Sequence, residues 1–324
     1  MRSAGVKWIG WAVLIAGLVL YPRLLGIYYT NLFVTLAVFG LYSVSFNMLL
    51  GYTGLLSFGH ALFFGAGGYG AALALKHLTG ISLLTAVGIG LLAAVVLALL
   101  LCPLVVRISG TAFCMLHLAF GQLMHMLAMK LRNITGGEDG IGGFPLPAVL
   151  SFDMKVPSNF YYFAMAVLGL SLWLMWFFTK TPFGQIQVGV RENAKRIDYL
   201  GFRITQTKAV VYVTAAAFAG VAGAIYALFQ NLISADSGFH VMVSFAPVIM
   251  TMIGGIGSFF GPIWGAAIFQ ILEEVTSRFT DRVELVVGLI LILTILFAPG
   301  GLAGLIQYVK QRWFAPKAGL EKAV

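Results

Sequence analysis

Two histidines are the residues best suited to chemistry inside the apolar segment 111–131 of this sequence. His117 and His125 are eight residues apart and fall on one helical face with Gly121 and Gln122. This spacing differs from the H-E-x-x-H pattern of zinc hydrolases, and the segment contains no carboxylate, so we expect no metal site. Two interpretations stay open for this polar face. We favour hydrogen bonds to a neighbouring helix over the lining of a polar pathway.

Two glycine-rich stretches interrupt the apolar runs. They read "GYTGLLSFGH" at 51–60 and "GGIGSFFGP" at 254–262, and glycine and proline both break helices. Broken helices in both halves of a chain are typical of a transport pathway or gate, although tight packing between helices explains each glycine equally well. We therefore take as candidate gate residues Gly51, Gly54, Gly254, Gly255, Gly257, Gly261 and Pro262. The candidate pathway residues are Ser57, His60, His117 and Gln122.

Other kinds of chemistry have little support in the apolar segments. We find isolated histidines there, and no nucleophile–base pair that would indicate an enzyme. An ion-coupled carrier usually places an acid inside a span, whereas Glu273 and Glu274 lie near a span end and Asp236 lies in a connection. The carrier stays the alternative function of another class.

The composition predicts the elements that hold these residues. Of the 324 residues, 60% are hydrophobic and 10% are charged, compared with about 25% charged in soluble domains. Several apolar runs reach the roughly 20 residues that a helix needs to cross a bilayer. We predict an all-α, polytopic transmembrane helical bundle that forms one domain over 1–324. Its ten spans are expected at 8–21, 27–50, 55–75, 82–106, 111–131, 160–179, 209–232, 241–254, 260–274 and 284–299.

The charges predict the orientation of this bundle. With ten crossings, one side receives 13 of the 20 lysines and arginines and 3 of the 11 acids. The positive-inside rule makes this side cytoplasmic, together with both termini and the basic tail 306–324. The net charge of +9 therefore reflects membrane orientation, and we expect no nucleic-acid partner.

The longest cytoplasmic connection, 180–208, contains the charged stretch "RENAKRIDYLGFR" at 191–203. Residues 185–200 contain no proline and many good helix formers, and Gly201 is a natural helix stop, so we predict a short helix. It is either a basic loop beside anionic lipid headgroups or a helix that docks into a groove of a soluble partner. Glu192, Ala194 and Gly201 resemble a degenerate form of the "EAA…G" loop of ABC importer permeases, with Asn193 between the acid and the alanine.

Seven blocks in order resemble the permease subunits of branched-chain amino acid ABC transporters, and the larger M-type most closely. They are "GYTGLLSFGHALFFGAGGYGAA" (51–72), "RISGTAF…LAFGQL" (107–123), "TGGEDGIGGFP" (135–145), "TPFGQ…RENAKRIDYLGF" (181–202), "AGVAGAIYA" (219–227), "GGIGSFFGPIWGAA" (254–267) and "LFAPGGLAGL" (296–305). In "LAFGQ", a glutamine follows the glycine where family members often carry an acid, and this departure weakens the substrate assignment.

The resemblance implies an importer in the bacterial inner membrane. An H-type permease would complete the pathway, two cytoplasmic ATPases would bind ATP and Mg, and a periplasmic protein would deliver the substrate. This chain would hold no cofactor, and it contains no G-x-x-x-x-G-K-[ST] phosphate loop. Branched-chain amino acids are the expected substrates, and urea, short amides or aromatic acids are the alternatives. Contact with the ATPase is expected from Arg191, Glu192, Asn193, Ala194 and Gly201. Contact with the binding protein is expected from Glu138 and Asp139, in a loop that could equally be a flexible solvated turn.

Overall fold

The computed structural model describes residues 21–22, 26–78, 80–149 and 152–280 and scattered positions between 282 and 304. Within these ranges, six helices are long and apolar enough to cross a membrane, as expected for a multi-pass membrane protein. The predicted span 8–21 and the tail 306–324 lie almost wholly outside the described residues, and the predicted span 284–299 is described only at scattered positions. The ten-span count and the cytoplasmic termini therefore stay predictions.

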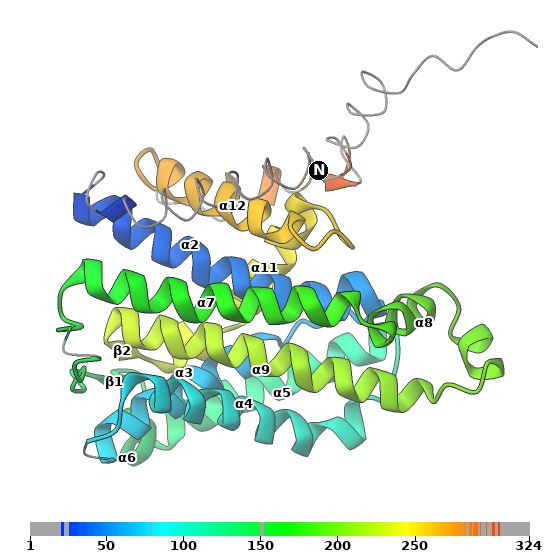
Figure 1. Ribbon diagram of the computed structural model, residues 1–324, viewed down its shortest axis with the longest axis horizontal. Helices are drawn as coiled ribbons and strands as arrows, with labels where there is room; N and C mark the ends of the chain where they lie inside the picture. Colours follow the sequence, from blue (N-terminus) through cyan, green and yellow to red (C-terminus); the bar gives the residue numbers. More distant parts are fainter. Residues whose placement is uncertain are drawn as a thin grey trace, which may run out of the picture.

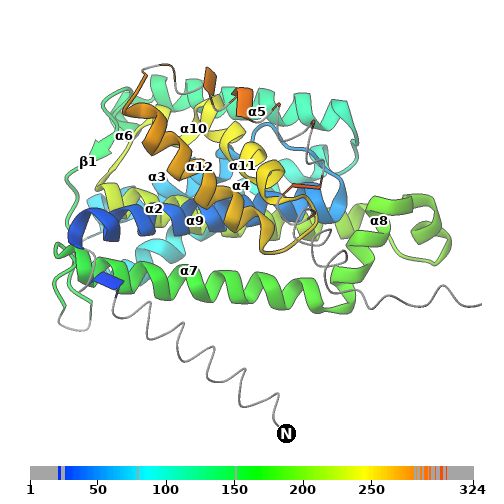
Figure 2. The same cartoon turned by 90° about the horizontal axis from the view of Figure 1, so that it is seen from above.

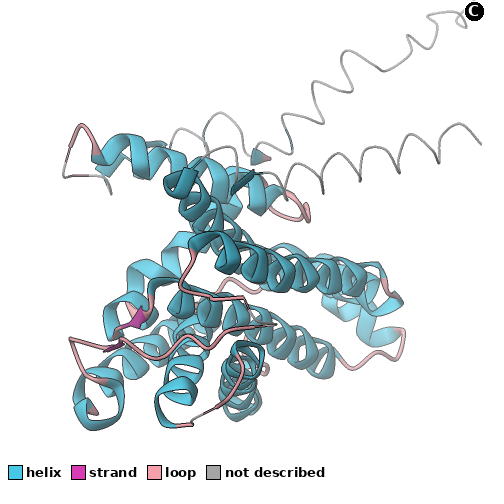
Figure 3. Cartoon of the chain, turned by 60° about the vertical axis from the view of Figure 1, so that its left-hand side comes forward, coloured by secondary structure: helices cyan, strands magenta, loops and turns pink. Residues whose placement is uncertain are grey.

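The described chain is mostly helical, as expected where only helices and closed barrels satisfy every backbone polar group within lipid. Figure 3 shows two very short strands among the helices. In chain order, the elements are α2 (Gly26–Asn47), η1 (Met48–Tyr52), α3 (Ala61–His77), α4 (Leu83–Val105), α5 (Thr111–Lys130), α6 (Arg132–Thr135), β1 (Ile141–Gly142), α7 (Pro157–Lys180), α8 (Pro182–Tyr199), α9 (Ile204–Gln230), β2 (Leu232–Ile233), α10 (Ala235–Phe239), α11 (Val241–Gly254) and α12 (Gly261–Ser277).

The long helices lie side by side, and the two ends of the bundle differ. Figure 1 shows α8 at one end, which we call the α8 end, and α6 with both strands at the other, which we call the α6 end. Turned by 90°, the bundle has α5 and α7 along opposite edges, with α2, α3, α4 and α9 between them (Figure 2). The connections α7–α8–α9 and α11–α12 therefore meet at the α8 end.

Small residues bring α3, α4 and α9 together at the centre. A Cβ atom added to Gly67 of α3 would lie 2.1 Å from the Gly220 carbonyl oxygen of α9. A Cβ on Gly223 would lie 1.9 Å from the Phe64 carbonyl oxygen, and one on Gly90 of α4 would lie 2.5 Å from that of Gly67. Backbones this close leave no room for a side chain, as is common where helices pack within membranes.

Two predicted spans have boundaries that depend on the glycine-rich stretches. The division of 241–274 is confirmed, because α11 ends at Gly254 and α12 begins at Gly261. The span predicted at 55–75 is wrong at its start, because α3 begins only at Ala61 and residues 54–60 are not helical. Before them, the five-residue π-helix η1 ends the long α2, and such π segments often lie at functional sites.

Candidate functional site

The two glycine-rich breaks contact each other at the α8 end through the wholly buried Asn47. Its Nδ2 donates to the Ser258 carbonyl (2.9 Å), and its Oδ1 accepts from the Gly257 backbone N–H (3.3 Å). A Cβ on Gly51 would lie 2.1 Å from Asn47 Oδ1 and 2.8 Å from Gly257 N. The missing side chain at Gly51 therefore lets the 255–260 connection lie directly against η1.

The non-helical stretch 54–60 is held inside the bundle by hydrogen bonds between side chains. Ser57 Oγ bonds with His117 Nδ1 (2.8 Å), and His117 Nε2 bonds with the Tyr212 hydroxyl (2.7 Å). His60 Nε2 bonds with Ser45 Oγ (2.9 Å). Ser57, His60 and His117 have no exposed surface, so the geometry agrees with the interhelical interpretation. Their role as pathway residues stays a prediction.

Gln122, the fourth candidate pathway residue, has a different environment, because its side chain is partly exposed on the outer face of α5. Met115 and Met126 on the same helix are 71% and 61% exposed. With a mean hydropathy of 1.4, α5 is the least apolar of the six candidate spans. This face therefore combines a polar side chain with flexible methionines, unlike the leucine-rich exposed side of α4.

The helix α8 is kinked, which corrects the prediction of one continuous helix over 185–200. Asn193 has extended backbone angles (φ −155°, ψ 93°) inside α8. Its Oδ1 accepts from the Arg196 backbone N–H (3.0 Å), the geometry of a helix N-cap. A short second helical segment, which we call the distal segment (194–199), therefore begins after the asparagine that interrupts the "EAA" pattern. Figure 1 shows it standing off the end of the bundle.

The distal segment stops just before Gly201, as predicted. This glycine has φ +85°, and its N–H donates to the Asp198 carbonyl (2.9 Å). The Phe202 N–H donates to the Ile197 carbonyl (3.3 Å), which completes a Schellman motif. Two apolar side chains at this turn, Tyr199 (88%) and Leu200 (65%), are largely exposed. They form a small exposed apolar patch at the outer end of α8.

Glu192 and Ala194 flank the kink, and Glu192 is exposed. The first segment of α8 packs against the bundle through its buried residues Gly184, Gln187 and Val190. Of the five candidate coupling residues, four therefore lie at the kink or around the distal segment. The fifth, Arg191, turns back toward the bundle, and its Nη1 donates to the Gly51 carbonyl.

The acidic loop at the α6 end is anchored by backbone pairing. In an antiparallel ladder, Ile141 pairs with Ile233 and Gly142 with Leu232. Glu138 and Asp139 are exposed just before this ladder. Both carboxylates therefore sit on a turn whose following strand is fixed, and their contact with a binding protein stays a prediction.

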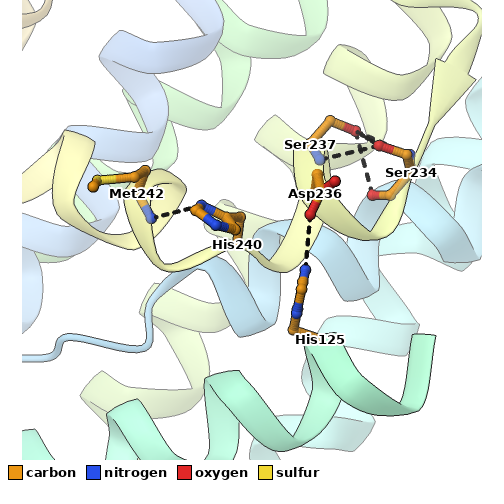
Figure 4. Close-up of polar contacts among 6 residues, drawn as sticks. All are labelled: His125, Ser234, Asp236, Ser237, His240 and Met242. Atoms are coloured by element: carbon orange, nitrogen blue, oxygen red, sulfur yellow. Dashed lines mark hydrogen bonds and ion pairs between the residues drawn. The ribbon is translucent and has the colours of Figure 1, made fainter. Parts of the chain in front are cut away.

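A polar cluster at the α6 end joins α5 to α10. Figure 4 shows His125 pointing at Asp236, and His125 Nε2 lies 2.9 Å from Asp236 Oδ1. Ser234 and Ser237 form a capping box that starts α10. The Met242 backbone N–H donates to His240 Nδ1 (3.3 Å) at the start of α11. Among the described residues, no three His, Cys, Asp or Glu side chains are arranged to hold a metal ion.

The comparison with sequence families decides the assignment. Residues 28–298 match the family described as "Branched-chain amino acid transport system / permease component". The chain belongs to this family. This permease is therefore of the branched-chain amino acid ABC transporter type, and its helices are those of a multi-pass membrane protein.

Relatives of both permease types resemble this chain. The high-affinity LivM permease of Salmonella typhimurium is 27% identical over 79% of this chain and 65% of its own length. The probable LivM permease of Methanocaldococcus jannaschii is 25% identical over 78% of this chain and 83% of its own length. The LivH permease of Salmonella typhimurium is 25% identical over 55% of this chain and 61% of its own length. The permease thus spans 65% of the Salmonella LivM. No solved structure matches it.

Sequence reasoning missed Asn47 and Ser258, the residues that join the two breaks. The available signal was a carboxamide inside a long apolar run, four residues before Gly51. Polar groups at membrane depth usually face a neighbour or a cavity, so Asn47 belonged among the candidates.

Proposed function

We propose that this chain is the permease subunit of an ATP-driven importer for branched-chain or related hydrophobic amino acids. The observation that carries the proposal is the arrangement at the α8 end. There, α8 carries the exposed distal segment at its outer end (Figure 1), while Arg191 of the same helix bonds to Gly51 and lies beside Gly257. A partner that moves α8 can therefore act on the breaks directly.

The chain would act as one half of a transmembrane pair in the bacterial inner membrane, with the α8 end in the cytoplasm. Its partner would be an H-type permease, as the similarity to both LivM and LivH suggests. Two ATPase subunits would bind ATP and Mg and dock on the distal segments, while this chain itself would be non-catalytic. A periplasmic binding protein would deliver the substrate to the α6 end, close to Glu138 and Asp139.

Because the binding protein would recognise the substrate, the transmembrane pathway would need little substrate selectivity of its own. Branched-chain amino acids are the proposed substrates because the matching family is described by them. Urea, short amides and aromatic acids are the alternatives within the same machinery.

The test is uptake of labelled leucine into proteoliposomes that contain this permease, an H-type permease, the ATPases and the binding protein. Uptake that requires both ATP and the binding protein is the expected result. Glu192→Lys serves as the coupling variant, because Glu192 is exposed beside the kink, and we expect it to abolish uptake. Stimulated ATP hydrolysis without leucine uptake would point to another substrate. Uptake that does not require ATP and is abolished by an ionophore would overturn the proposal in favour of an ion-coupled carrier.

A further inference from the structure

The side chain of Arg191 lies across three glycines that belong to both breaks. Its Nη1 donates to the Gly51 carbonyl at the end of η1. A Cβ on Gly257 would lie 3.2 Å from the same Nη1, and a Cβ on Gly54 would lie 3.1 Å from Arg191 Cγ. The guanidinium therefore sits where the 255–260 connection meets η1, and its stem passes over Gly54.

The position of this cation follows from the end of a helix. The last carbonyls of a helix have no partner along the chain and carry partial negative charge. Since the chain leaves helical geometry after Thr53, the Gly51 carbonyl is free to accept from a side chain. A guanidinium suits this place because its planar fork offers several donors at fixed angles. A lysine would offer one compact, more strongly hydrated group.

Asn47 makes the second contact between the same elements, through the Ser258 carbonyl and the Gly257 N–H. We call Asn47, Gly51, Arg191, Gly257 and Ser258 the latch. Arg191 lies two residues before the kink at Asn193, at the end of the α8 segment that packs on the bundle. The latch is thus the point where α8, η1 and the 255–260 connection are joined by side chains.

We propose that Arg191 is a positioning residue for transport that acts within the permease, fastening α8 to both breaks. This inference rests on the proposed function. A displacement of α8 by the ATPase moves the Arg191 guanidinium, and the guanidinium moves η1 and the 255–260 connection together. Asn47 keeps the two breaks in register during this movement. Loss of Arg191 leaves the docking surface intact and disconnects it from the breaks.

The test compares Arg191→Gln and Arg191→Lys with Arg107→Gln, which removes an exposed positive charge from the α4–α5 connection at the same end. In the reconstituted importer, ATP hydrolysis and leucine uptake are measured on the same vesicles. We expect Arg191→Gln to hydrolyse ATP normally while uptake per ATP falls about tenfold, equivalent to about 1.4 kcal/mol of lost coupling. Arg191→Lys should recover part of the coupling, and Arg107→Gln should match the wild type.

Asn47→Ala provides a second variant that does not alter α8. It should lower uptake per ATP in the same way, and the double variant with Arg191→Gln should lose less than the product of the two single effects. A proportional fall of hydrolysis and uptake in Arg191→Gln would assign this residue to ATPase docking and overturn the proposal. Unchanged uptake per ATP would also overturn it.

Hydrogen exchange of the purified permease tests the latch without any transport. Arg191→Gln should speed exchange in peptides that cover 48–55 and 254–262, and it should leave the α3–α4–α9 core unchanged. If Arg191→Gln and the wild type exchange at the same rate in both breaks, the latch is refuted. If wild-type vesicles show neither ATP-dependent uptake nor ATP hydrolysis stimulated by the binding protein, the proposed function fails, while the exchange result still decides whether the latch exists.

Discussion

Replacing Asn193 with alanine should straighten α8 and weaken docking of the ATPase. The wild-type kink relies on extended backbone angles at Asn193 and on its side-chain cap to the Arg196 N–H. Loss of an asparagine N-cap costs about 1 kcal/mol, and alanine favours a helix interior over asparagine by about 0.6 kcal/mol. Asn193 is exposed, so no core packing changes with it. Together, these terms shift the balance between kinked and straight α8 by about 1.5 kcal/mol, or roughly tenfold.

The assay is equilibrium binding of the purified ATPase to the permease in nanodiscs, read by fluorescence anisotropy. We expect Asn193→Ala to weaken binding by up to about tenfold, because straightening redirects the distal segment and its exposed side chains. Asn193→Ser is the matched control, since serine caps a helix about as well as asparagine and also removes the carboxamide. Equal affinities for the alanine and serine variants would refute the argument that the cap sets the direction of the distal segment.

Three further predictions concern the bundle itself. His117→Ala should lower the free energy of unfolding in detergent by about 2–4 kcal/mol, because it leaves two buried hydroxyl groups without this hydrogen-bond partner and creates a cavity. A loss no larger than that caused by an alanine substitution at an exposed position would contradict this. Gly67→Ala should lower the melting temperature, because its Cβ would meet the α9 backbone at 2.1 Å. Gly88→Ala is the control and should leave the melting temperature unchanged, because its Cβ would meet nothing within 4 Å. Equal changes of the melting temperature in the two variants would refute the packing argument. Asp236→Asn, which weakens an exposed contact to His125, should change stability by less than about 1 kcal/mol in chemical denaturation.

The apolar runs and helix breakers were enough to predict most of the described helices. Long runs bounded by polar residues or proline, such as α4 and α7, match their predicted ranges within a few residues. The glycine and proline of 254–262 also predicted the division between α11 and α12. These features are local, because composition and breakers act within a few turns of helix.

Contacts between distant segments were beyond the sequence. The segment 54–60 is apolar enough to suggest a helix, yet its polar groups bond to partners such as His117, which is 60 residues away from Ser57. Arg191 was predicted to contact the ATPase, which stays a prediction, and its bond to a carbonyl 140 residues away was not foreseen. The kink at Asn193 depends on one side-chain cap, and helix propensity alone favours continuing the helix.

The non-helical stretch before α3 also has a consequence for the biogenesis of the chain. Ser57 needs His117 of α5, and the Ala61 N–H donates to Ser244 Oγ of α11 (3.0 Å). Lipid offers no hydrogen bonds in place of these partners, and both emerge from the ribosome after α3. α3 is also short, at 17 residues, and buried mainly against α4 and α9. We therefore expect this part of the chain to stay in the translocon, or in contact with an insertion factor, until the second half of the protein has been made.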